Sequence, residues 1–187
     1  MPSPVAEISI HEDDEGMRNL YPMAARAEAD ADMTASVEAS ARNRAPDGIG
    51  WTDVHLIEPP KATFANVGLT IAAAAEALEP LLPRVRRFVC GGGDSARNPF
   101  AYRNSDAYCF GFDETCFIKL DVKDDLVERI WYEARTEDVR HLSALRQALC
   151  AIDALSPAMV ADYWLHATGP VADTAFMDAY FKALGGA

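Results

Sequence analysis

Two short segments of the chain carry side chains of the types that do chemistry. The first, His11–Glu15, places one imidazole beside the four carboxylates of Glu12, Asp13, Asp14 and Glu15. These are the ligand types of a hard divalent cation or of a histidine-assisted transition-metal site. However, their spacing lacks the alternating ligand positions and the distant bidentate glutamate of an EF-hand loop. We therefore expect a solvated turn without a metal, whose carboxylates are candidate partner-binding residues.

The second segment is Cys90 with the glycine-rich residues 91–94 behind it, at the end of an apolar run. A glycine-rich turn after a strand can present backbone N–H groups to an anion, and a thiol there can act as a nucleophile with His55 or His11 as base. Neither a Lys-Ser/Thr pair nor the GxGxxG spacing follows. A buried cysteine before a flexible loop is the favoured interpretation, and a Cys90–His55 pair is the catalytic alternative.

The other histidines and cysteines form no recognisable motif. His141 and His166 fall in different expected elements from His55, and no CxxC pair occurs. Cys109 and Cys116 are expected as diagonal neighbours on one hairpin face, too far apart for a relaxed disulfide. The acidic pairs at 113–114 and 124–125 are expected to form turns. The sequence therefore predicts no cofactor site and no metal site.

Composition restricts the classes of partner. The chain has 187 residues, of which 50% are hydrophobic, and a formal net charge of -12. This suffices for a single domain over 1–187, with its core in 46–187 and with residues 1–45 at the periphery or only partly ordered. The negative charge disfavours nucleic acid, because such binding depends on lysine and arginine at phosphates, and it permits a basic protein partner.

Export and membrane signals are not apparent. The first residues lack the positive start and apolar run of a signal peptide, and the longest apolar stretch, 67–82, is interrupted by Glu76, Glu79 and Pro80. A chain of this size does not need disulfides in order to fold. We therefore expect a cytoplasmic protein with reduced cysteines and no membrane contact.

Hydrophobic patterns predict an α+β fold. An antiparallel meander spans about 106–133, in runs at 107–112, 116–121 and 126–133, and earlier strands are expected at 5–10, 52–58 and 85–89. Helices are expected at 22–44, 68–82, from Thr136 to Ile152, from Ser156 to about 168, and at 171–184. Because runs of strands precede runs of helices, the sheet should be antiparallel and packed by helices, with a helical C-terminal segment.

One aromatic residue of the meander is a candidate for partner binding. Trp131 shares a strand face with Glu133, which predicts that part of the meander is an exposed recognition surface. The alternative is a core covered by helices. The covered core is the favoured interpretation, and Trp131 is kept as a candidate partner-binding residue.

Three functional hypotheses follow. The preferred one is a non-catalytic acidic protein-binding module that masks a basic partner, as a bacterial immunity or antitoxin-type protein does. The alternative is a small hydrolase or transferase that uses the glycine-rich loop after Cys90. The third is a homodimer formed through the C-terminal helices, whose aromatic residues exceed what one core requires: Tyr163, Trp164, Tyr180 and Phe181.

Overall fold

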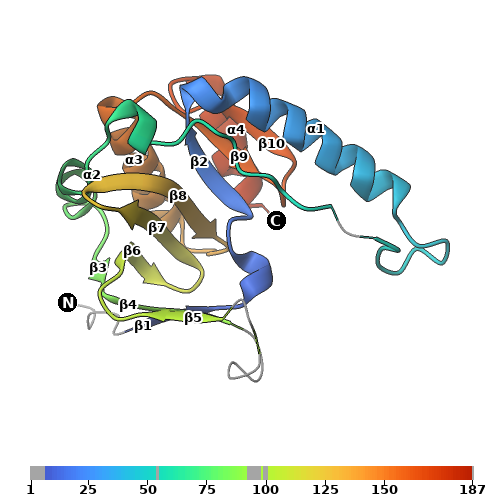
Figure 1. Cartoon of the computed structure of the whole chain (residues 1–187), viewed down its shortest axis with the longest axis horizontal. Helices are drawn as coiled ribbons and strands as arrows, with labels where there is room; N and C mark the ends of the chain where they lie inside the picture. The colour runs from blue at the N-terminus through green and yellow to red at the C-terminus, as the bar shows by residue number, and fades with distance from the viewer. Residues whose placement is uncertain (1–6, 54, 92–97, 99–100, 187) are drawn as a thin grey trace.

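The protein has an α+β fold with two sheets, as its sequence pattern predicts. The computed structural model describes residues 7–53, 55–91, 98 and 101–186 (Figure 1). A seven-stranded sheet has the order β10-β9-β2-β8-β7-β6-β3, and a three-stranded sheet has the order β1-β4-β5. All strand pairs are antiparallel except β1 with β4, which is parallel.

The strands are short before the meander and longer within it. Their bounds are β1 Glu7–Ile10, β2 Arg18–Pro22, β3 Arg84–Val85, β4 Arg87–Cys90, β5 Tyr102–Asn104, β6 Tyr108–Asp113, β7 Cys116–Lys123, β8 Leu126–Ala134, β9 Ala158–Asp162 and β10 Ala167–Pro170. The α-helices are α1 Arg26–Arg42, α2 Ile71–Leu78, α3 Val139–Leu155 and α4 Thr174–Leu184. The described residues also form the 3-10 helices η1 Glu12–Asp14, η2 Met23–Ala25 and η3 Ala65–Val67.

Each face of the seven-stranded sheet is covered. On one face, Leu20, Ile118 and Ile130 belong to a core cluster that includes apolar residues of α2, α3 and α4. On the other face, the three-stranded sheet packs over β6–β8 through a cluster that contains Phe88, and α1 packs over β2 and β9. Figure 1 shows α1 above and the small sheet below the meander. Alternating side chains of the same strands therefore enter different cores.

The meander β6–β7–β8 is confirmed, with a register one residue away from the expected one. The turn falls at residues 114–115, because the carboxylate of Asp113 accepts hydrogen bonds from both the backbone N and the hydroxyl of Thr115 (2.8 and 2.6 Å). Cys109 consequently pairs with Lys119 and lies on the face opposite to Cys116. The prediction that the two cysteines share a face was wrong, since a one-residue change of register exchanges the faces.

The largest error concerns the segment after α3. Residues 156–168 were expected to form a helix, but they form the hairpin of β9 and β10. Every residue of β9 is buried, because both of its faces are covered. A continuous apolar run in such a strand has the same appearance as a buried helix, so periodicity does not separate them.

Strand assignments elsewhere differ from expectation as well. The described residues of the expected strand at 52–58 do not form a strand. An isolated bridge pairs Arg44 with Trp51 just before this segment. Two strands were not predicted, β5 and β2. β2 is interior to the sheet, so N-terminal residues expected at the periphery supply a central strand. Its polar start and its proline conceal it in the sequence.

The helices otherwise follow the predicted pattern. Helix α1 buries only Ala29, Met33 and Ala39, which agrees with an expected surface helix. Helix α3 begins after Asp138, whose carboxylate accepts from Arg140 N, rather than after Thr136. In the described part of the chain, none of the helices has both the length and the apolar character needed to cross a membrane.

The close approach of β6 and β7 at Gly111 should be sensitive to added volume. A Cβ atom at Gly111 would lie 2.4 Å from Phe117 Cβ and 2.5 Å from the Cys116 carbonyl oxygen. We expect Gly111→Ala to lower the free energy of unfolding by about 1–3 kcal/mol, measured by urea denaturation. Gly186→Ala, where the nearest atom is 3.4 Å away, is the control and should change it by less than about 0.5 kcal/mol. Equal stabilities would contradict the packing described here.

Candidate functional site

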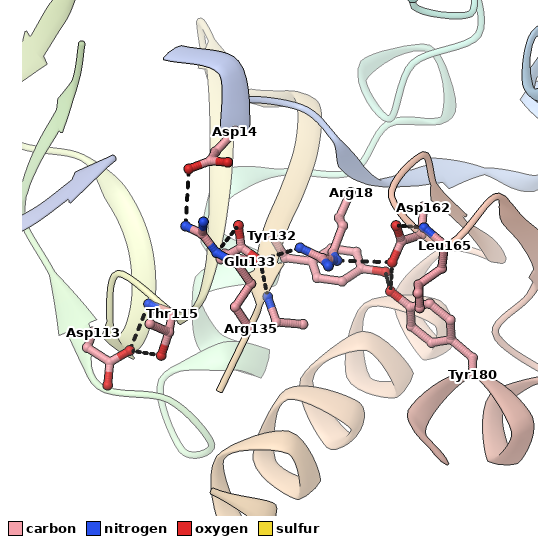
Figure 2. A network of polar contacts seen from close by, with 11 residues as sticks. Asp14, Arg18, Asp113, Thr115, Tyr132, Glu133, Arg135, Asp162, Leu165 and Tyr180 are labelled. Atoms are coloured by element: carbon pink, nitrogen blue, oxygen red, sulfur yellow. Dashed lines mark hydrogen bonds and ion pairs between the residues drawn. The ribbon is translucent and has the colours of Figure 1, made fainter. Parts of the chain in front are cut away.

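A buried polar cluster joins the ends of β2, β8 and β9. Arg18 begins β2 and lies opposite Asp162, the last residue of β9. Its Nε donates to Asp162 Oδ2 at 3.0 Å, and its Nη1 donates to Glu133 Oε1. All three side chains are buried. Figure 2 shows the guanidinium lying between the two carboxylates.

Two tyrosines extend this cluster toward α4. Tyr180 Oη donates to Asp162 Oδ2 at 2.8 Å and lies 2.7 Å from Tyr132 Oη. The remaining oxygen of Asp162 accepts from Leu165 N at 3.0 Å. Burial, followed by the neighbouring acidic groups, raises the pKa of both tyrosines, so they are neutral hydrogen-bonding groups at physiological pH.

At its other end the cluster reaches the surface. Arg135, which is exposed, donates from Nε to Glu133 Oε2 at 3.2 Å and from Nη2 to Asp14 Oδ2 at 3.1 Å. Burial raises the pKa of Glu133, and the guanidinium of Arg18 opposes this shift. Two hollows of the described surface are lined by other residues. The polar atoms of the cluster are thus directed at one another and join β2, β8, β9 and α4.

A second polar group lies between the two sheets. Arg129 donates to Glu15 Oε1 and to Asp121 Oδ2, each at 2.7 Å, and Lys119 pairs with the other oxygen of Asp121. Burial disfavours the charged form of Asp121, but Lys119 and Arg129 outweigh it and lower the pKa of the carboxyl. The Lys119 ammonium also lies over the rings of Phe88, Tyr102 and Trp131, 5.2–5.7 Å from their centroids.

Trp131 is part of this group and is not exposed. Its side chain packs edge-on against Phe88 and Phe117, and its Nε1 donates to Asp121 Oδ2 at 3.2 Å. Only 1% of the residue is accessible to solvent. The expectation of an exposed recognition surface at Trp131 is therefore corrected, because the three-stranded sheet covers this face of the meander.

The acidic segment 12–15 is mostly engaged within the fold. It forms η1, and His11 Nδ1 accepts from Asp13 N at the start of that helix. Asp14 and Glu15 form ion pairs with Arg135 and Arg129. Glu12 Oε1 accepts from the side chain of Asn98 at 2.8 Å. Only Asp13, with 82% of its side chain exposed, is directed to solvent as expected for a partner-binding residue.

The structure separates Cys90 from His55, whereas His11 directly follows Ile10, the residue that pairs with Cys90 in the β1–β4 register. Cys90 is fully buried at the end of β4, and its thiol donates to Glu15 Oε2 at 3.4 Å. Burial, followed by the charge of Glu15, raises the pKa of Cys90 to about 12, which disfavours a thiolate nucleophile. His55 lies instead beside α1, with its Nε2 3.3 Å from Asp32 Oδ1. Most of the glycine-rich loop after Cys90, residues 92–97, lies outside the described residues.

The other candidate residues do not converge on a site. His141 stacks on the ring of Phe112 with centroids 3.9 Å apart. His166 is exposed in the β9–β10 turn, with a positive φ of 50°. Within the described part of the chain, no three histidine, cysteine or acidic side chains are grouped so that they could hold a metal ion.

Comparison with known proteins does not add a function. No family model, no curated protein and no solved structure matches the chain. Sequence reasoning missed Arg18 and Asp162, although the charge of Asp162 inside the apolar run 158–163 was a usable signal. It also assigned Tyr163 and Tyr180 to a dimer face, whereas both are buried in the cores of their own chain.

Removing the buried guanidinium should be costly. In Arg18→Met, Glu133 and Asp162 lose the cation between them, and we expect the free energy of unfolding to fall by about 3–5 kcal/mol at neutral pH. Urea denaturation measures this change. Arg26→Met, which removes the exposed pair with Asp30 at 3.5 Å, is the control and should cost no more than about 0.5 kcal/mol. Similar losses in both variants would show that the cluster does not stabilise the sheet.

Thiol labelling tests the catalytic alternative directly. Cys150 is exposed, whereas Cys90, Cys109 and Cys116 are buried, and burial raises the pKa of each of these three thiols to about 12. We expect a thiol reagent at mildly alkaline pH to label Cys150 in the native protein, and Cys150→Ser to abolish rapid labelling. The protein unfolded in denaturant, in which all four cysteines react, is the control. Rapid native labelling of Cys90 would restore the catalytic hypothesis.

Proposed function

We propose that the chain is a non-catalytic protein-binding module that recognises a basic protein partner and masks its functional surface, as a bacterial immunity or antitoxin-type protein does. The observation that carries this proposal is the excess of acidic side chains at the surface. The net charge is -12, and nine of the 17 lysines and arginines are in ion pairs with described carboxylates. Arginines and lysines in ion pairs with carboxylates are Arg18, Arg26, Arg84, Arg86, Lys119, Arg129, Arg135, Arg140 and Arg146.

Many carboxylates, in contrast, are exposed and have no ion pair with another described residue. They are Glu7, Glu38, Glu58, Glu76, Glu79, Glu114, Asp124, Asp125 and Glu137. They occur on helices, turns and strand edges around the molecule. An anionic surface of this kind accelerates encounter with a cationic protein and disfavours anionic partners.

The hydrolase or transferase alternative has less support. It requires a reactive thiol and a nearby base, whereas the Cys90 thiol is buried beside the carboxylate of Glu15. Of the two candidate bases, His55 lies beside a different core cluster, and His11 is half exposed with its Nδ1 beside Glu12 and Asp13. A carboxylate neighbour raises the free energy of a thiolate, so this environment opposes nucleophilic activation.

Salt-dependent association tests the proposal. The chain is immobilised, proteins retained from the native cell extract are identified by mass, and the purified partner is then used in kinetic measurements. We expect a partner with basic isoelectric point, and an association rate that falls as ionic strength rises. Neutralising Asp13, Glu76 and Glu79 with Asn or Gln should slow association by roughly severalfold.

The control variant neutralises the same number of exposed cations, Lys61, Arg103 and Lys123, and should not slow association. Asp14 and Glu15 are left intact, because they hold Arg135 and Arg129. Retention of no basic protein, or an association rate that is insensitive to salt, would refute the proposed function.

A further inference from the structure

An arm projects from the body of the molecule. It consists of residues 34–53 and 55–58, that is, the distal part of α1 and the segment behind it, and Figure 1 shows it extending away from both sheets. The returning segment is held to α1: Thr52 N donates to Asn43 O at 2.7 Å, and Trp51 Nε1 donates to Ser40 Oγ at 3.2 Å. These hydrogen bonds within the arm therefore hold the returning segment against α1.

Large apolar side chains of the arm face solvent. The exposed fractions are 82% for Ile49, 77% for Leu56, 63% for Trp51 and 40% for Val37. These residues do not belong to the core clusters of the described residues, and several large exposed apolar side chains in one projecting segment indicate an interaction site.

The charges of the arm are predominantly negative. Its acidic residues are Glu38, Asp47, Asp53 and Glu58, and its cations are Arg42 and Arg44. The arm is thus an apolar surface with an excess of carboxylates. A complementary surface would combine apolar side chains with an excess of cations.

A groove with that character lies between α3 and α4 of the same chain. Its volume is about 380 Å³, and its lining includes Val139, Leu142, Arg146, Phe181 and Lys182. Val139 is 74% exposed. Arg146 pairs with Asp178 at 2.5 Å and lies over the Phe181 ring, and Lys182 is exposed. Because Arg146 is paired with Asp178, the exposed Lys182 gives the groove its excess of positive charge beside the apolar groups.

We propose that the arm of one copy docks in the α3–α4 groove of a second copy. Trp51 and Ile49 would cover Val139 and Phe181, and the carboxylates of Asp47 and Glu58 would lie near Lys182 and Arg146. The contact is between molecules, because the arm of each chain points away from its own α3 (Figure 1). Net repulsion between two anionic chains is screened at physiological salt, where the Debye length is about 8 Å, so the local complementarity determines association.

Light scattering of the purified chain at increasing concentration tests this association without any other partner. We expect the wild-type mass to rise from monomer to dimer. The arm variant Ile49→Ser/Trp51→Ser should raise the dissociation constant by at least about tenfold, because it removes a buried aromatic anchor. The groove variant Val139→Asp/Lys182→Glu should do the same. Trp164→Ser, which removes a tryptophan that is 50% exposed elsewhere, is the matched control and should behave as wild type.

Mixing the two defective variants gives the sharper result. Each variant alone should be monomeric, but an equimolar mixture should form a dimer, because the intact arm of the groove variant meets the intact groove of the arm variant. Circular dichroism confirms that both variants are folded. A wild type that stays monomeric, an arm variant that still dimerises, or a mixture that remains monomeric would each overturn the inference.

The outcome is distinguishable from that of the proposed function. If the wild type is monomeric and the arm variant no longer retains a basic protein from the extract, the arm serves that partner and the self-association is refuted. If the dimer forms as expected but no basic protein is retained, the self-association holds and the proposed function fails.

Discussion

The buried guanidinium of Arg18 is the interaction on which the rest of the structure depends. β2 joins β9 and β10 to the meander, and Arg18 at its start binds Asp162 of β9 and Glu133 of β8. The two carboxylates lie on the strands that flank β2, and without this cation they would repel each other in a medium of low polarity. The tyrosines of α4 and β8 complete the hydrogen bonding of the same group and so align a helix with the sheet.

The internal use of cations determines the character of the surface. Arginines and lysines form ion pairs at the ends of strands and between the two sheets. Between the sheets, Arg129 and Lys119 neutralise Asp121, and Arg129 also binds Glu15. Since the chain contains many more acidic than basic residues, the carboxylates left over accumulate on the outside. This links the packing of the core to the proposed recognition of a cationic partner.

Much of the fold, and little of the candidate site, was predictable from the sequence. The meander, α3 and α4 have strong alternating or helical periodicity, so local patterns identify them. β2 and β9 do not, because a strand covered on both faces lacks alternation. Trp131 was a candidate for an exposed surface for a related reason: the sequence does not show that a second sheet covers its face.

The sequence alone determined the properties that are sums or local patterns: the fold class, the strong negative charge, and the acidity of the segment 12–15. Tertiary structure decided which charges remain available, by pairing Asp14 and Glu15 with arginines of β8 and beyond, and by burying the Cys90 thiol away from His55. The two ion pairs, Asp14 with Arg135 and Glu15 with Arg129, each join residues more than a hundred positions apart in the sequence. Their formation depends on how the sheets stack, and no local pattern of side chains encodes a contact at that separation.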